Sequence, residues 1–110
     1  SCHRVPVIDG HTMAIWLDID DPVEEIKKAF ENFRSPFSGL PHQPDEPVHL
    51  CNQNNRPQPR LDRNRGNGMT VSVGRVREGL RFVATGHNTI RGAAGASVLN
   101  AELIVSRKYL

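Results

Sequence analysis

Residues 12–34 of the chain, TMAIWLDIDDPVEEIKKAFENFR, decide the fold because a strand pattern passes directly into a helix pattern. In the first part, over residues 12–19, apolar side chains alternate with the residues between them, which is the period of a half-buried strand. The apolar positions are Met13, Ile15, Leu17 and Ile19. This alternation predicts a sheet that buries one of its faces.

The second part predicts a helix over residues 22–34. Asp21 can cap this helix, Pro22 suits its first position, and Glu24 completes a capping-box pattern. Glu24 is also spaced to pair with Lys28 on the helix surface. Apolar residues recur at steps of three and four, at Val23, Ile26, Ala29, Phe30 and Phe33. We therefore expect this face of the helix to lie on the sheet.

The next part of the chain adds two loops, a short strand and a hairpin. Residues 35–47 hold four prolines and are expected to form a loop. A short strand, Val48–Cys51, separates this loop from a second and strongly polar one at residues 52–68. Alternating apolar residues then predict a hairpin whose strands lie near 69–73 and 80–84.

A long helix over residues 89–107 completes the pattern, with Gly92 and Gly95 permitting a close approach to its first turns. Its apolar face holds Ile90, Ala94, Val98, Ala101 and Val105. The resulting order β, β, α, β, β, β, α predicts an α+β fold, an antiparallel sheet with helices on one face, rather than a βαβ repeat. Because no GxGxxG motif follows a strand, we expect no complete dinucleotide-binding fold.

The composition limits the expected partners and compartment. The chain has 110 residues, a formal net charge of +2 and no apolar run near the roughly 20 residues that a membrane span needs. Without such a run, no membrane span is expected. Basic residues concentrate only in residues 56–65, and no aromatic residue is interleaved there to stack on bases, so no nucleic acid is expected. No metal is expected, because the histidines and cysteines lack metal-ligand spacing. Cys2 and Cys51 are interpreted as free thiols of a cytoplasmic protein.

Arg4 and His11 could carry chemistry near the start of the chain. The guanidinium of arginine is a planar fork that suits a carboxylate, and an imidazole takes up and releases protons near neutral pH. A regular strand would place residues seven positions apart on opposite faces. The two can converge only if Asp9-Gly10 bends the chain; otherwise Arg4 is a surface cation and His11 a turn residue.

The last motif is HNTIRGAAG, residues 87–95, where the C-terminal helix is expected to begin. The free amide groups and the positive dipole end of a helix start can hold a nucleotide. The alternative is a helix start whose small residues serve packing alone.

Four blocks of the chain resemble the aspartate-β-semialdehyde dehydrogenase family, in its archaeal and fungal branch. They are CHRVPVIDGHT (2–12), RPQPRLDR (56–63), VSVGRVRE (71–78) and HNTIRGAAG (87–95). The resemblance implies that residues 1–88 form the C-terminal portion of a catalytic and dimerisation domain with a glyceraldehyde-3-phosphate-dehydrogenase-like fold. It implies that residues 89–110 form a helix that returns to a Rossmann domain that binds NADP. The chain is therefore expected to be a C-terminal fragment.

The resemblance also implies an activity, the NADPH-dependent reductive dephosphorylation of aspartyl phosphate to aspartate β-semialdehyde with release of phosphate. His11 would relay protons, Arg4 would bind the substrate carboxylate, and Asn88 and Thr89 would contact the nicotinamide end of NADP. The implied nucleophile, which forms a thioester, is a cysteine in an upstream S-N-C segment and not Cys2. We therefore expect the fragment alone to be inactive.

Two alternatives stay open at this stage. One is a related acyl-thioester reductase of the malonyl-coenzyme-A reductase type, and the other is a non-catalytic interaction or dimerisation module. The resemblance implies a homo-oligomer, either a dimer or a tetramer, because the sheet of this family lies between subunits and the chain alone would expose an apolar face. Residues 56–65 are expected to form a structured loop near the subunit interface, without chemistry of their own.

Overall fold

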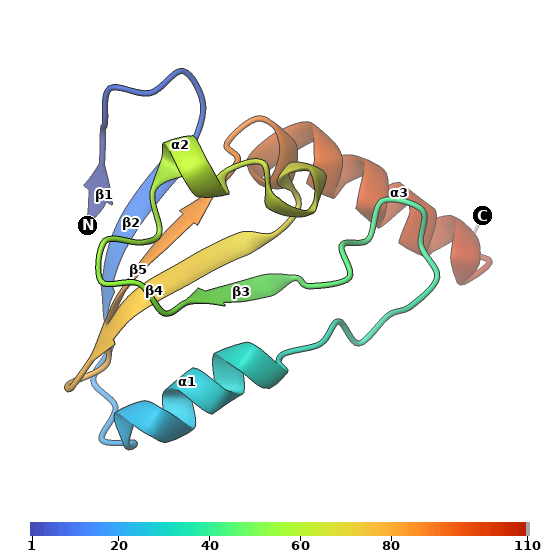
Figure 1. The fold of residues 1–110 in the computed structure, drawn as a ribbon. Helices are drawn as coiled ribbons and strands as arrows, with labels where there is room; N and C mark the ends of the chain where they lie inside the picture. Colours follow the sequence, from blue (N-terminus) through green and yellow to red (C-terminus); the bar gives the residue numbers. More distant parts are fainter. Residues whose placement is uncertain (110) are drawn as a thin grey trace.

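A five-stranded sheet in the order β1-β2-β5-β4-β3 forms the centre of the computed structural model, which describes residues 1–109 (Figure 1). The strands are β1 (Cys2–His3), β2 (His11–Trp16), β3 (Val48–Cys51), β4 (Val71–Arg77) and β5 (Arg81–Gly86). The helices are α1 (Val23–Asn32), α2 (Pro59–Asp62) and α3 (Gly95–Ser106), with a 3-10 turn η1 (Arg65–Gly68) and a π turn η2 (Ile90–Ala94). The predicted α+β order of elements is confirmed, and α2 and η1 are added to it.

The sheet is mixed, and not purely antiparallel as predicted. β1 with β2, β2 with β5, and β4 with β5 pair antiparallel, and the last two strands form the predicted hairpin. β3 pairs parallel with β4, so that Val48 lies opposite Val71. Parallel neighbours need a crossover connection of about a dozen residues or more, and residues 52–70 supply it. The crossover reads in the sequence as a polar loop, which is why the parallel pair was not predicted.

α1 packs on one face of the sheet, as predicted. Ile26 of α1 joins Val73, Phe82 and Ala84 in the buried core, and the rings of Phe30 and Phe82 meet edge to face with centroids 5.3 Å apart. Such an aromatic pair stabilises the contact beyond the area that it buries. The helix and the sheet therefore form the main core of the molecule.

The ends of α1 differ from the prediction. The cap position is Pro22, whose carbonyl accepts bonds from the amides of Glu25 and Ile26, so Asp21 is not the cap. Proline offers no side-chain acceptor, and the exposed first turn is left to solvent. On the surface Glu24 pairs with Lys27 at 2.8 Å and not with Lys28.

The second face of the sheet is covered by the crossover, which corrects the prediction of helices on one face only. Because Val73 faces α1, the next residue of β4, Gly74, faces the other way. A Cβ on Gly74 would lie 2.6 Å from the carbonyl oxygen of Arg56, so only glycine lets the crossover approach this closely. Asp62 of α2, which is part of this crossover, is fully buried.

β2 ends at Trp16, three residues before the predicted end of the strand at residue 19. Trp16 pairs with Arg81, the first residue of β5, and beyond it the hairpin turn leaves β2 no partner strand. Leu17 still donates its amide to the carbonyl of Leu80 at 3.1 Å. Leu17 and Ile19 are exposed, because the sheet ends there.

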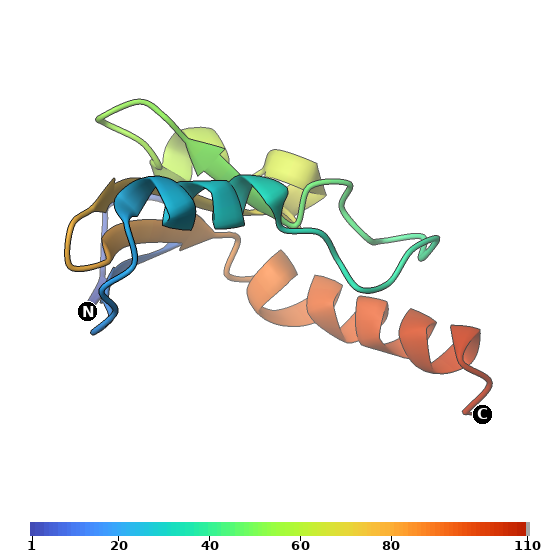
Figure 2. The same cartoon turned by 90° about the horizontal axis from the view of Figure 1, so that it is seen from below.

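α3 extends away from the sheet, as Figure 2 shows, and begins at Gly95 rather than at the predicted residue 89. The first turn is the π turn η2, which widens the helix start. Its predicted apolar face is largely exposed, with Val98 and Val105 among the exposed large apolar residues. That residues 89–110 pack on an NADP-binding domain stays a prediction, and Leu110 lies outside the described residues.

Candidate active site

The bend at Asp9-Gly10 brings Arg4 and His11 together. β1 and β2 pair with His3 opposite Thr12, so the next position along each strand sets Arg4 toward His11. Gly10 makes the turn with a φ of 124°, which a side chain would disfavour. Arg4 and His11 line one cavity of about 340 Å³ and are both exposed to it. The convergence that the sequence permitted is therefore present.

Asn88, from the segment after β5, lines the same cavity. The complete lining consists of Cys2, His3, Arg4, Val5, Val7, Ile8, Gly10, His11 and Asn88. Three of the four predicted site residues thus share one space. Thr89, the fourth, is not among the lining residues, and its hydroxyl lies 3.2 Å from Nδ1 of His87.

Hydrogen bonds from β5 and its extension hold the main chain around His11. The hydroxyl of Thr85 donates to the carbonyl oxygen of His11 at 3.1 Å, and it also lies 2.9 Å from the hydroxyl of Thr12. The amide of Gly10 donates to Oδ1 of Asn88 at 2.7 Å. Because Thr85 is fully buried, the backbone that presents His11 is anchored in the sheet.

A second hollow of about 340 Å³ lies on the β5 side of His11. It is lined by His11, Met13, Val71, Gly86, His87, Asn88, Arg91 and Gly92. His11 and Asn88 line both hollows and so form the wall between them. His87, which is buried, and Arg91 were not among the predicted site residues. Both lie within HNTIRGAAG, so their closeness to Asn88 in the sequence could have identified them.

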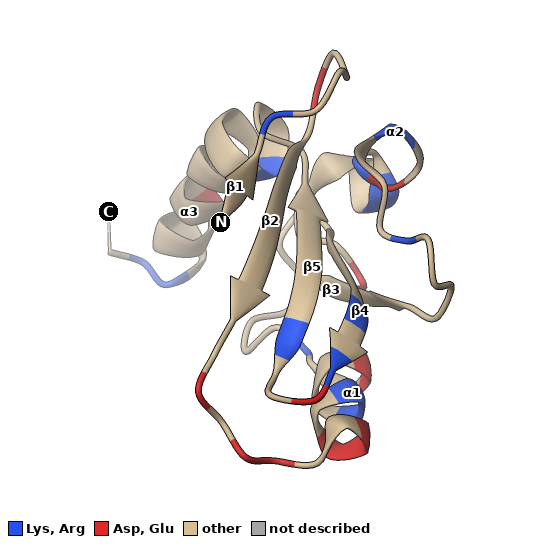
Figure 3. Ribbon diagram, turned by 90° about the vertical axis from the view of Figure 1, so that its left-hand side faces the viewer, with Lys and Arg blue, Asp and Glu red and all other residues tan. Residues whose placement is uncertain are grey.

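The electrostatics of the two hollows suit an anion. Arg4 lines one and Arg91 the other, and no Asp or Glu is found among the described residues that line either. Figure 3 shows Lys, Arg, Asp and Glu on α1, α2 and the β4–β5 hairpin, while β1 and β2 carry none of them. An imidazole between two guanidinium groups can exchange a proton with a bound anionic substrate.

The two cysteines lie in different environments. Cys51 is buried at the end of β3, and burial, followed by the negative charge of Asp62, raises the pKa of its thiol. Cys2 is exposed on β1 and lines the cavity of Arg4 and His11. A thiol needs a lowered pKa to act as a nucleophile, so Cys51 is a structural residue.

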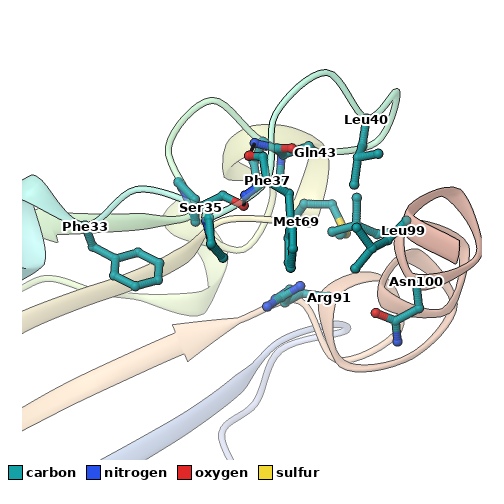
Figure 4. Close-up of a pocket in the computed structure, with 13 residues that line it drawn as sticks. Phe33, Ser35, Phe37, Leu40, Gln43, Met69, Arg91, Leu99 and Asn100 are labelled. Carbon is teal, nitrogen blue, oxygen red and sulfur yellow. Dashed lines mark hydrogen bonds between the residues drawn. The ribbon is translucent and has the colours of Figure 1, made fainter. Parts of the chain in front are cut away.

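A third cavity, of about 220 Å³, opens between residues 33–47 and α3 (Figure 4). Figure 4 shows Leu40 and Leu99 pointing toward Met69, with Arg91 beside them. None of the four predicted site residues lines this cavity. It is an apolar space next to the candidate site and not part of it.

The segment from residue 56 to 65 is built on a buried carboxylate. Asp62 accepts hydrogen bonds from Nε of Arg56 at 2.8 Å and from the amide of Gln58 at 2.7 Å, and Arg65 lies 3.5 Å away. Burial alone would raise the pKa of Asp62, but the bonds from Arg56 and Gln58 outweigh it and lower the pKa. The burial of this carboxylate was not predicted, because Asp62 lies among arginines in a polar stretch.

Over residues 1–109 we find no cluster of three or more His, Cys, Asp or Glu side chains that could hold a metal ion. Within the same residues, no helix has the length and apolar character needed to cross a membrane.

Residues 1–91 match the family model described as semialdehyde dehydrogenase, dimerisation domain. Among curated relatives, the aspartate-semialdehyde dehydrogenase of Archaeoglobus fulgidus is 53% identical across 100% of this chain and 33% of its own length. The enzyme of the same name from Aspergillus fumigatus is 43% identical across 100% of the chain and 34% of its own length. The chain therefore spans about a third of the relatives that it matches.

Two solved structures share the fold. The crystal structure of aspartate semialdehyde dehydrogenase with NADP from Candida albicans superposes with a TM-score of 0.83 and 41% identity, over 97% of this chain and 33% of that one. Aspartate semialdehyde dehydrogenase II from Vibrio cholerae superposes with a TM-score of 0.70 and 28% identity, over 97% and 30% of the two chains.

Proposed function

Because the chain belongs to the semialdehyde dehydrogenase dimerisation-domain family, we propose that it supplies the acid/base and substrate-binding half of an aspartate-semialdehyde dehydrogenase active site. The observation that carries this proposal is the single cavity in which Arg4, His11 and Asn88 meet without a carboxylate. The reaction is the NADPH-dependent reductive dephosphorylation of aspartyl phosphate to aspartate β-semialdehyde. The thiol nucleophile and most of the cofactor site then belong to the part of the enzyme that this chain does not span.

His11 is the proton carrier in this proposal. His11 lines both hollows, so its imidazole can serve a substrate in one and a cofactor in the other. An imidazole held there can accept a proton from a nucleophilic thiol and give one to an oxygen of the departing phosphate. The hydrogen bond from Thr85 to the carbonyl oxygen of His11 holds the backbone that carries the ring.

Arg4 is the substrate-binding residue. Aspartyl phosphate keeps its α-carboxylate, and a guanidinium can hold a carboxylate by two parallel N–H···O bonds. Arg4 is exposed in the cavity beside His11, where a bound substrate would place its reacting carbon between the two residues. We assign Arg91, on the far side of His11, no step in the reaction.

Asn88, together with Thr89, is proposed to contact the nicotinamide end of NADP. NADPH supplies the hydride when it is bound. The hollow beside Asn88 fits a flat amide-bearing ring, because Gly86 and Gly92 line it without side chains. The Oδ1 atom of Asn88 is occupied by Gly10, which leaves its NH₂ group to donate to a carboxamide oxygen.

We further propose that the domain assembles with copies of itself, as the description of its family model indicates. Ile8, between β1 and β2, is 92% exposed, and Trp16, the last residue of β2, is 78% exposed. Exposed large apolar residues of this kind are typical of an interface. We place the enzyme in the cytoplasm, which the two free thiols support.

The test is turnover by the full-length enzyme that carries this domain. His11→Ala should lower kcat by roughly 10²–10⁴-fold, the usual range for a general acid/base. His49→Ala is the matched control, because His49 lies on β3 beside Glu46 at the other edge of the sheet. An unchanged kcat in His11→Ala would remove His11 from the mechanism. Faster turnover of malonyl-coenzyme A than of aspartyl phosphate would favour the related reductase instead.

A further inference from the structure

The Arg-rich segment, residues 56–65, reaches the bend that carries His11. Nη1 of Arg63 donates a long hydrogen bond of 3.5 Å to the carbonyl oxygen of Asp9. A Cβ placed on Gly10 would lie 2.7 Å from Cβ of Pro59, so α2 and the bend are in direct contact. Arg63 and Pro59 of the Arg-rich segment therefore contact the two neighbouring residues of the bend, Asp9 and Gly10.

The Arg-rich segment is itself rigid enough to act as a support. Its centre is the fully buried Asp62, which binds Arg56, the amide of Gln58 and Arg65. Arg63 follows Asp62 directly, and its Nε atom is buried and lacks a hydrogen-bond partner among the described residues. Arg63 is therefore a packed side chain whose direction is set by the segment, and not a mobile surface cation.

The bend needs support from this side. On its other side Asn88 accepts the amide of Gly10, and Thr85 binds the carbonyl of His11. Between these bonds the carbonyl of Asp9 receives a hydrogen bond only from Arg63 among the described residues. A glycine with a φ of 124° has several accessible backbone states, so an unsupported bend would move the ring of His11.

We propose that Arg63 is a positioning residue for His11, which it orients by holding the carbonyl of Asp9 while Pro59 fixes Gly10. This inference rests on the proposed function, since orienting His11 serves the proton transfer assigned to it. A displacement of about 1 Å at a catalytic group can cost up to roughly 10²-fold in rate. The segment thereby gains a part in the reaction without touching substrate.

The test compares Arg63→Lys with Arg63→Met in the full-length enzyme. The two side chains have similar length, but only lysine keeps a donor for the carbonyl of Asp9. Arg63→Met should lower kcat by roughly ten-fold with the substrate KM within about two-fold, and Arg63→Lys should recover most of that loss. Arg60→Met is the control, since Arg60 is an exposed residue of the same Arg-rich segment, within α2.

A second readout separates positioning from stability and from the proposed function. In the full-length enzyme labelled at histidine, Arg63→Met should shift the ring signals of His11, identified by their loss in His11→Ala, while Arg60→Met should not. Equal kcat values for the lysine and methionine variants, with an unmoved His11 signal, would overturn the inference. If the wild-type enzyme does not reduce aspartyl phosphate, the proposed function fails, while a shifted ring signal still supports the positioning contact.

Discussion

The amide of Gly10 donates a 2.7 Å hydrogen bond to Oδ1 of Asn88, which joins the bend before His11 to the chain leaving β5. These residues are 78 positions apart in the sequence. Because of this bond, the oxygen and the NH₂ group of the Asn88 side chain have different roles. Its oxygen holds the bend, and its NH₂ group stays available as the donor that we propose for the nicotinamide.

Asn88→Asp should therefore separate the two tasks. Aspartate keeps an acceptor for Gly10 but has no NH₂ donor, so the KM for NADPH should rise roughly ten-fold, the loss of about one hydrogen bond. Asn88→Ala removes both ends and should lower kcat as well, because the bend is released. Steady-state kinetics with varied NADPH measure both effects. If Asn88→Asp left the NADPH KM unchanged, Asn88 would serve the bend alone.

Arg4→Lys should raise the KM for aspartyl phosphate with a smaller effect on kcat. A lysine keeps the charge but cannot make the two parallel bonds of a guanidinium, so an increase of roughly ten-fold is expected. Arg77→Lys, at the exposed end of β4, is the matched control. A KM equal to that of wild type would make Arg4 a surface cation.

Cys2→Ser tests whether the nucleophile lies in this chain. Cys2 lines the cavity of Arg4 and His11, so its position alone would allow the role. The proposed function places the thiol elsewhere in the enzyme, and kcat/KM should then stay within about two-fold of wild type. A loss of several orders of magnitude would instead identify Cys2 as the attacking group.

The elements that the sequence predicted are those whose side chains repeat with a regular period. α1 and the β4–β5 hairpin follow from such patterns, because each pattern reports which face is buried. The parallel direction of β3 and the helix α2 do not. The crossover at residues 52–70 sets that direction and contains α2 and the buried Asp62, and its polar sequence shows no repeating pattern. A carboxylate among arginines looks like solvated surface until its partners are located.

The candidate site divides in the same way. Arg4 and His11 were identified from their residue types, an Asp-Gly bend that lets them converge and the family resemblance of residues 2–12, and the structure brings them into one cavity. Arg63 carries no such mark, because its partner is a main-chain carbonyl, which the sequence cannot assign. Residue types alone therefore do not identify a residue that positions another one by bonding to main-chain atoms.

Asp62→Asn should destabilise the protein and change its response to acid. In the folded state the pKa of Asp62 lies below its usual value of 3.8, so its ionised form stabilises the fold above about pH 4, and that contribution is lost as the pH falls through the folded-state pKa. Removing the buried charge leaves Arg56 without its partner and should cost about 3 kcal/mol at pH 7. Urea unfolding at pH 7 and at pH 3 measures both, and the difference from wild type should shrink at the lower pH. Glu102→Gln, which breaks the exposed pair with His42, is the control and should have a smaller effect. A difference that stayed constant between the two pH values would mean that the charge of Asp62 does not stabilise the segment.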